Sequence, residues 1–175
     1  MLTSAFAMDS KRGLDGFERA SIDAIKNARG HSNMGNIYFH QENYVSALKE
    51  YQIAYNLTKN TNSSSVYLYN ISKCFMKTGR YKLAQDAIMG AILKDCMNLT
   101  YYDALVDTFI ALNETENELR KHLNDNSNPY NRIVAGLIYL KTNQKTNAKI
   151  IFDEFISSNP DMLITNDVKV ILKRL

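Results

Sequence analysis

The sequence lacks the features that nucleic-acid-binding, membrane-spanning and disulfide-stabilised proteins need. Its 175 residues include 21 basic and 18 acidic side chains, and the net charge of +3 is too small for the basic surface that nucleic-acid binding needs. No run of about 18 apolar residues occurs, so no membrane-spanning helix is expected. Cys74 and Cys96 are too few for a disulfide framework, and we predict that both stay reduced. We therefore predict that the protein does not bind nucleic acid and does not span a membrane.

Motifs that carry catalysis are missing as well. The sequence has no His-Glu-x-x-His or Cys-x-x-Cys spacing, no glycine-rich phosphate loop and no nucleophile elbow. His31, His40 and His122 fall on three different expected helices, with His31 expected in a core and the other two on surfaces. We therefore expect no enzyme activity, no metal and no cofactor.

The first residues leave two interpretations open. Residues 1–7, MLTSAFA, end in an Ala-x-Ala of the kind that signal peptidase cuts, but a basic start and most of the apolar region of a signal are absent. We interpret the match as chance, which predicts a cytoplasmic protein. The alternative is the remnant of a signal peptide, which predicts an exported or periplasmic one. Residues 1–8 are accordingly expected to be a flexible N-terminus or a signal remnant.

What the sequence does contain is one spacing that occurs three times. Small residues and large apolar ones follow each other in steps of three, nine, four and three. The steps of three and four stay on one helical face, and the step of nine crosses a turn at HQENY, KTGRY or KTNQK. Each unit is thus expected to be a helical hairpin, and the units must stack because neither helix can bury its face alone. The three sets are Gly35, Tyr38, Ala47, Tyr51 and Ala54; Ser72, Phe75, Ala84, Ile88 and Ala91; and Gly136, Tyr139, Ala148, Phe152 and Phe155.

These residues resemble the tetratricopeptide repeat, whose pattern has an aromatic, Leu, Gly and Tyr in the first helix and Ala, Phe and Pro in the second. His31 stands where that pattern has its tryptophan, and Pro160 closes the last copy. The matching segments are 28–61, 65–98 and 129–162. A degenerate fourth unit at 99–128 lacks the small residue, so its hairpin is expected to be looser. The resemblance implies an all-α, right-handed superhelical solenoid of antiparallel helix pairs that binds other proteins without catalysis.

Both ends of the array are expected to be capped. Residues 9–27 are predicted to form a half-repeat or a capping helix, with Leu14 and Phe17 turned inward. Residues 163–175 are predicted to form a C-terminal capping helix, because Val168, Ile171 and Leu172 make an apolar stripe that can cover the last repeat.

Tetratricopeptide proteins usually take an extended or helical peptide in the concave groove of the solenoid, so the resemblance implies a protein or peptide ligand. The stripe of each first helix opposite its partner-facing residues should line that groove. Asn side chains there can bond a peptide backbone, and Lys73 and Lys77 would favour an acidic or C-terminal peptide. The alternative is that these are merely solvated helix faces. The predicted groove residues are Arg29, Asn33, Asn36, His40, Tyr69, Asn70, Lys73 and Lys77.

One specialised version of the family clamps the C-terminal carboxylates of heat-shock proteins with two Asn and several Lys or Arg. Asn36 and Asn70 stand at the asparagine positions of that clamp. Ser32, Thr100 and Ala104 stand where it needs cations, so we do not predict this version.

The first helix of the last repeat, 129–141, has scarcely a polar face. Tyr130, Val134 and Leu137 belong to its groove stripe and form a possible apolar docking patch. A helix that is apolar all round is expected to be covered all round, either by the C-terminal helix or by a second protein. The second cover would fit a homo-oligomer, or an assembly subunit of a larger envelope, secretion or pilus-type complex.

Overall fold

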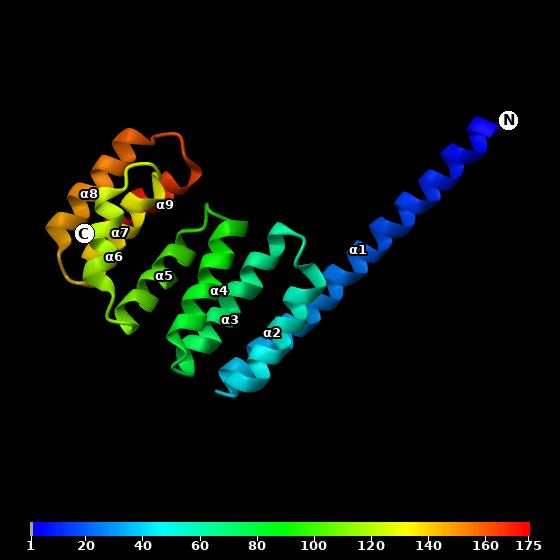
Figure 1. Ribbon diagram of the computed structural model, residues 1–175, viewed down its shortest axis with the longest axis horizontal. Coiled ribbons are helices and arrows are strands. Elements are labelled where there is room, and N and C mark those ends of the chain that lie inside the picture. The colour runs from blue at the N-terminus through cyan, green and yellow to red at the C-terminus, as the bar shows by residue number, and fades with distance from the viewer. Residues whose placement is uncertain (1) are drawn as a thin grey trace.

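The chain folds into a row of antiparallel helix pairs, as a computed structural model shows (Figure 1). The structure describes the backbone of residues 2–175 and the side chains from Glu18 onward. No strand occurs in this range, and none of its helices is long and apolar enough to cross a membrane. The all-α solenoid predicted from the spacing is therefore confirmed. The helices are α1 Leu2–His40, α2 Tyr44–Thr58, the short 3-10 helix η1 Asn62–Ser64, α3 Ser65–Lys77, α4 Tyr81–Lys94, α5 Leu99–Ala111, α6 Thr115–Asn124, α7 Tyr130–Lys141, α8 Lys145–Ser158 and α9 Leu163–Leu172.

Close contact between the two helices of a pair follows from the repeated spacing. Gly35 of α1 faces the ring of Tyr51 of α2, and Gly136 of α7 faces the ring of Phe152 of α8. Neither glycine has room for a Cβ atom. The small residue thus lets an aromatic ring of the second helix lie directly against the backbone of the first.

The turns within the pairs share one backbone conformation. Glu42, Gly79, Asn113 and Asn143 each follow the first helix of a pair and have φ values of 60°, 71°, 58° and 61°. In all four turns the amide of the next residue donates to a carbonyl five residues earlier in the chain, as Arg80 does to Phe75 over 2.9 Å. The single residue in the left-handed conformation lets these amides satisfy carbonyls at the end of each first helix. The chain therefore reverses in the same way each time.

The first helix is longer than the sequence analysis predicted. Residues 9–27 are not separated from the first repeat, because α1 runs without a break from Leu2 to His40. The cause is that no proline interrupts the stretch, and an isolated glycine such as Gly30 weakens a helix without ending it. The expected inward packing of Leu14 and Phe17 concerns side chains outside the described ones.

Only the last part of α1 packs on the solenoid. Ala28 is buried with Ala54 of α2 and Tyr67 of α3, whereas the side chains from Glu18 to Asn27 are exposed except for the partly covered Ala24. The N-terminal half of α1 accordingly extends away from the other helices (Figure 1).

The third pair is the irregular one. α6 has ten residues against 14 in α4 and α8, and none of them is fully buried. A cavity of about 400 Å³ lies beside its end, between Met89 and Leu93 of α4 and Tyr130 of α7. The looseness of this hairpin follows from the missing small residue, and direct packing of α5 on α7 keeps the row of helices continuous.

The C-terminal helix α9 closes the array. Ile164 and Val168 of α9 are part of the largest buried cluster, which also contains Val134 and Leu137 of α7. α9 thus covers an apolar face of the last helix pair, as a capping helix of a solenoid does.

Candidate peptide-binding groove

A cavity of about 450 Å³ opens between the C-terminal end of α1 and the facing sides of α3 and α5. Phe39 is the contribution of α1, while Tyr69, Lys73 and Lys77 come from α3 at helical spacing. The remaining wall is α5, where small and apolar residues alternate with carboxylates. Its lining there consists of Thr100, Asp103, Ala104, Asp107, Ile110 and Ala111. The first helices of successive pairs thus form one concave surface.

The wall on α3 is positively charged. The Lys73 ammonium lies 4.8 Å from the ring centroid of Phe39 and 5.4 Å from that of Tyr69. Its one hydrogen bond, to Oδ1 of Asn70, is long at 3.5 Å. Among the described residues no carboxylate lies within ion-pair distance of Lys73 or Lys77. Two aromatic rings therefore hold one ammonium at the cavity, and neither lysine is neutralised there.

The wall on α5 is negatively charged. Asp103 and Asp107 stand one helical turn apart, and the Lys141 ammonium of α7 lies 3.0 Å and 2.6 Å from their Oδ1 atoms. Burial alone would lower the pKa of Lys141, but its hydrogen bonds to Asp107 and Asp103 outweigh burial and raise that pKa. The lysine is therefore charged at neutral pH, and two carboxylates with one ammonium leave one negative charge on this wall.

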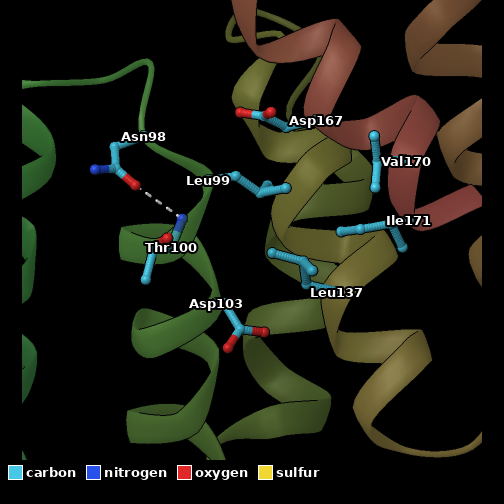
Figure 2. Close-up of a pocket in the computed structure, with 8 residues that line it drawn as sticks. All are labelled: Asn98, Leu99, Thr100, Asp103, Leu137, Asp167, Val170 and Ile171. Atoms are coloured by element: carbon cyan, nitrogen blue, oxygen red, sulfur yellow. Dashed lines mark hydrogen bonds between the residues drawn. The ribbon is translucent and has the colours of Figure 1, made fainter.

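A second cavity of about 410 Å³ lies between α5, α7 and α9 (Figure 2). Thr100 and Asp103 line both cavities, so the two meet on α5. On the far side lie Leu137 of α7 and Asp167, Val170 and Ile171 of α9. The Asn98 side chain caps α5 by accepting a hydrogen bond from the Thr100 amide over 3.1 Å (Figure 2). We call the two joined cavities the groove.

The structure brings together only some of the residues that the sequence analysis proposed for the groove. Tyr69, Lys73 and Lys77 line the first cavity. Asn70 does not face it freely, because only 8% of this residue is exposed. The role of Asn70 in binding a peptide stays a prediction; its Oδ1 lies 3.5 Å from the Lys73 ammonium at the cavity.

The predicted residues of α1 lie outside both cavities. Arg29, Asn33, Asn36 and His40 are exposed on α1, but the cavity at the end of this helix is lined by Phe39 instead. Oδ1 of Asn36 also accepts a hydrogen bond from the hydroxyl of Tyr51 over 2.7 Å. This asparagine therefore binds its own hairpin with the oxygen that was expected to receive a peptide amide.

The predicted apolar docking patch is not available on the surface. Val134 is 2% and Leu137 1% exposed, because both are packed in the cluster that α9 completes. The ring of Tyr130 stacks on Tyr102 of α5 with the ring centroids 5.5 Å apart. Of the two covers expected for this helix, the C-terminal helix and a second protein, the structure shows the C-terminal helix.

The sequence analysis missed the role of Phe39 as well as the Asp103–Lys141–Asp107 contact. Asp103 and Asp107 could have been noticed as two carboxylates four residues apart on one helix face. Their neighbour Lys141 lies 34 residues beyond Asp107, so no local pattern could pair them.

The histidines also differ from the expectation, because His31 and His40 lie on the same helix, α1, and His122 lies on α6. His31 is not in a core: its Nδ1 lies 2.7 Å from Glu50 of α2, and 39% of its side chain is exposed. His122 is not on the surface, because it packs beside Phe109 and its Nδ1 bonds Oδ1 of Asn131 over 2.8 Å. Within the described side chains, no three His, Cys, Asp or Glu residues are close enough together to hold a metal ion.

Comparison with known proteins agrees with this geometry. Residues 132–162, which include most of α7 and all of α8, match the family model described as "Tetratricopeptide repeat". No curated protein sequence matches the chain.

Two solved structures are similar over most of the chain. The tetratricopeptide-repeat domain of Arabidopsis OM64 is 13% identical with a TM-score of 0.50, and the match covers 86% of this chain and 98% of that one. The first such domain of Spaghetti (RPAP3), bound to the HSP90 peptide SRMEEVD, is 15% identical with a TM-score of 0.50, and the match covers 86% of this chain and 94% of that one. At these identities the likeness concerns the fold.

Paired helices with glycine–aromatic contacts define a helical-repeat solenoid. Residues 132–162 match a tetratricopeptide repeat, and the chain as a whole shares the fold of tetratricopeptide-repeat domains.

Proposed function

We propose that this chain is a noncatalytic adaptor or chaperone-like module that binds a peptide segment of a partner protein in the groove. The observation that supports this most is the junction of the two cavities at Thr100 and Asp103. Together the two cavities extend from the C-terminal end of α1 to α9. The tetratricopeptide-repeat domain of Spaghetti (RPAP3), which holds a peptide, supports a ligand of the same kind here.

The charge of the α3 wall supports an acidic or C-terminal peptide as the ligand. Lys73 and Lys77 line the first cavity, and no carboxylate among the described residues is paired with either. Ammonium groups in such a position can each bind a carboxylate of a ligand. The rings of Phe39 and Tyr69 hold Lys73 in place, so little side-chain entropy is lost when the ligand binds.

A charge reversal tests the proposed function. The probe is a fluorescein-labelled peptide that ends in two glutamates and a free carboxylate, and its binding is followed by fluorescence anisotropy. Lys73→Glu with Lys77→Glu should weaken binding by roughly tenfold or more at low salt and should flatten its salt dependence. The matched control reverses the two exposed lysines of α8, Lys145→Glu with Lys149→Glu, and should leave the affinity within about twofold. Equal affinities of the two double variants would place the site elsewhere.

A further inference from the structure

The groove carries charges of both signs that do not meet. Lys73 and Lys77 lie on the α3 wall of the first cavity, and Asp103 and Asp107 lie on its α5 wall. No ion pair within 4.0 Å joins the two walls in the described part of the chain. Opposite charges across an open cavity attract a ligand that can satisfy both.

The acidic wall has capacity left for a cation. Lys141 contacts Oδ1 of Asp103 and Oδ1 of Asp107, and no hydrogen bond among the described residues uses either Oδ2 atom. Both carboxylates are about half exposed, at 47% and 48%. In the adjoining second cavity Asp167 of α9 adds another exposed carboxylate. From α3 to α9 the groove thus changes from positive to negative.

We infer that the groove selects peptide segments that carry an acidic and a basic side chain close together, an inference that rests on the proposed function. The acidic group binds Lys73 and Lys77, and the basic group binds Asp103 and Asp107. Directly packed helix axes lie about 8–10 Å apart and α3 and α5 face each other across a cavity, so with about 3.3 Å per residue of extended chain the two charged residues are about three or more positions apart. A purely acidic segment would instead place a carboxylate beside Asp103 and Asp107, which like charges disfavour.

The experiment measures whether the basic residue of the ligand matters. A library of short fluorescein-labelled peptides varies two positions, three residues apart, over Glu, Lys and Ala, with uncharged residues randomised elsewhere. Peptides with Glu and Lys should bind roughly threefold to tenfold more tightly than those with Glu and Ala. The orders Glu-x-x-Lys and Lys-x-x-Glu are both included, and the order that binds more tightly gives the direction of the peptide in the groove.

Variants of the acidic wall separate the inference from a general loss of fold. Asp107→Asn should remove the advantage of the Lys-containing peptides and leave the Glu–Ala peptides unaffected. Lys141→Met removes the competing ammonium and should tighten binding of the Glu–Lys peptides, an effect opposite in sign to any loss of structure. The control is Asp86→Asn, an exposed carboxylate of α4 outside the groove, which should change neither.

The outcomes are distinct. If Glu–Ala peptides bind as tightly as Glu–Lys peptides and still depend on Lys73 and Lys77, the two-charge ligand is wrong and the proposed function stands. If no library member binds but the acidic C-terminal probe does, the two-charge ligand is wrong and the proposed function stands; if neither binds, both are overturned.

Discussion

A Cβ atom placed on Gly35 would lie 2.6 Å from Cε1 of Tyr51, well inside van der Waals contact. The ring cannot move aside easily, because Tyr51 is buried and its hydroxyl donates to Asn36 over 2.7 Å. The first hairpin of the solenoid is therefore built around the absence of a single side chain.

Gly35→Ala should overpack this contact and lower the free energy of unfolding by about 1–3 kcal/mol, measured by urea denaturation. Gly30→Ala is the matched control, since a Cβ there meets nothing within 4 Å. In the same helix it should raise stability by about 0.5–1 kcal/mol, because alanine loses less backbone entropy than glycine. Similar midpoints for the two variants would contradict the packing described for the first pair.

Glu42 occupies the turn position where the second pair has Gly79, and its φ of 60° is unfavourable for a residue with a Cβ atom. Glu42→Gly should therefore stabilise the protein by about 1 kcal/mol. Gln41→Gly, one residue earlier and without a positive φ, should destabilise it instead. Thermal unfolding followed by circular dichroism measures both, and a loss of stability in both variants would refute the left-handed turn.

The cover that α9 provides can be tested with two adjacent residues. Ile164 is 1% exposed and Leu163 is 74% exposed. Ile164→Ala should lower the free energy of unfolding by about 2–5 kcal/mol, whereas Leu163→Ala should change it by less than about 0.5 kcal/mol. A rise in hydrophobic-dye binding is expected for Ile164→Ala only, because loosening α9 uncovers Leu137 of α7. Equal effects would mean that α9 does not pack on this cluster.

The two cysteines should differ in reactivity. Both are free, Cys74 is buried, and Cys96 is partly exposed beside the hydroxyl of Tyr130 at 3.4 Å. A thiol reagent should modify Cys96 in the folded protein and reach Cys74 only after unfolding. In Cys96→Ala the folded protein should therefore not react with the reagent. Detection of a Cys74–Cys96 disulfide by peptide mapping without reductant would contradict the separation of the two thiols.

Alkaline pH should destabilise the fold. Burial raises the pKa of the Cys74 thiol from 9.0 to about 11. Burial and the neighbouring Cys74 raise the pKa of Tyr51 from 10.0 to about 12. The unfolded chain loses these protons at the lower, ordinary pKa values, so the contribution of these two groups to stability is constant below about pH 8 and falls as pH rises through 9 and 10. Urea midpoints between pH 8 and 11 should show the decline, and Cys74→Ala should make its first part shallower; a stability that rises above pH 9 would contradict it.

The fold was predictable because its determinants are local. Gly35 and Tyr51 are sixteen positions apart in the sequence, as are Gly136 and Phe152, and periodicity alone places both members of each pair on facing sides of two helices. The unbroken α1 was not predictable in this way, since a glycine such as Gly30 only weakens a helix and no packing partner marks a boundary.

The groove was predictable only in part. Helical spacing puts Lys73 and Lys77 on one stripe, and the structure places both in one cavity with Tyr69. How Lys141 reaches Asp103 and Asp107 depends on how one pair stacks on the next, which the sequence of a single helix does not contain. The burial of Asn70 depends on the same stacking.

Because α6 is short, the two faces of the solenoid differ in how well they tolerate a change in chain length. On the concave side, α5 packs directly on α7, so the surface that carries the groove does not need α6 for its continuity. On the other side, the missing turn leaves about 400 Å³ beside Met89 and Leu93. The connection after α6 is exposed around Asn126, so a group attached there lies outside the groove. This connection is therefore the natural position for a fluorescent label or a fused domain that reports on peptide binding without disturbing it.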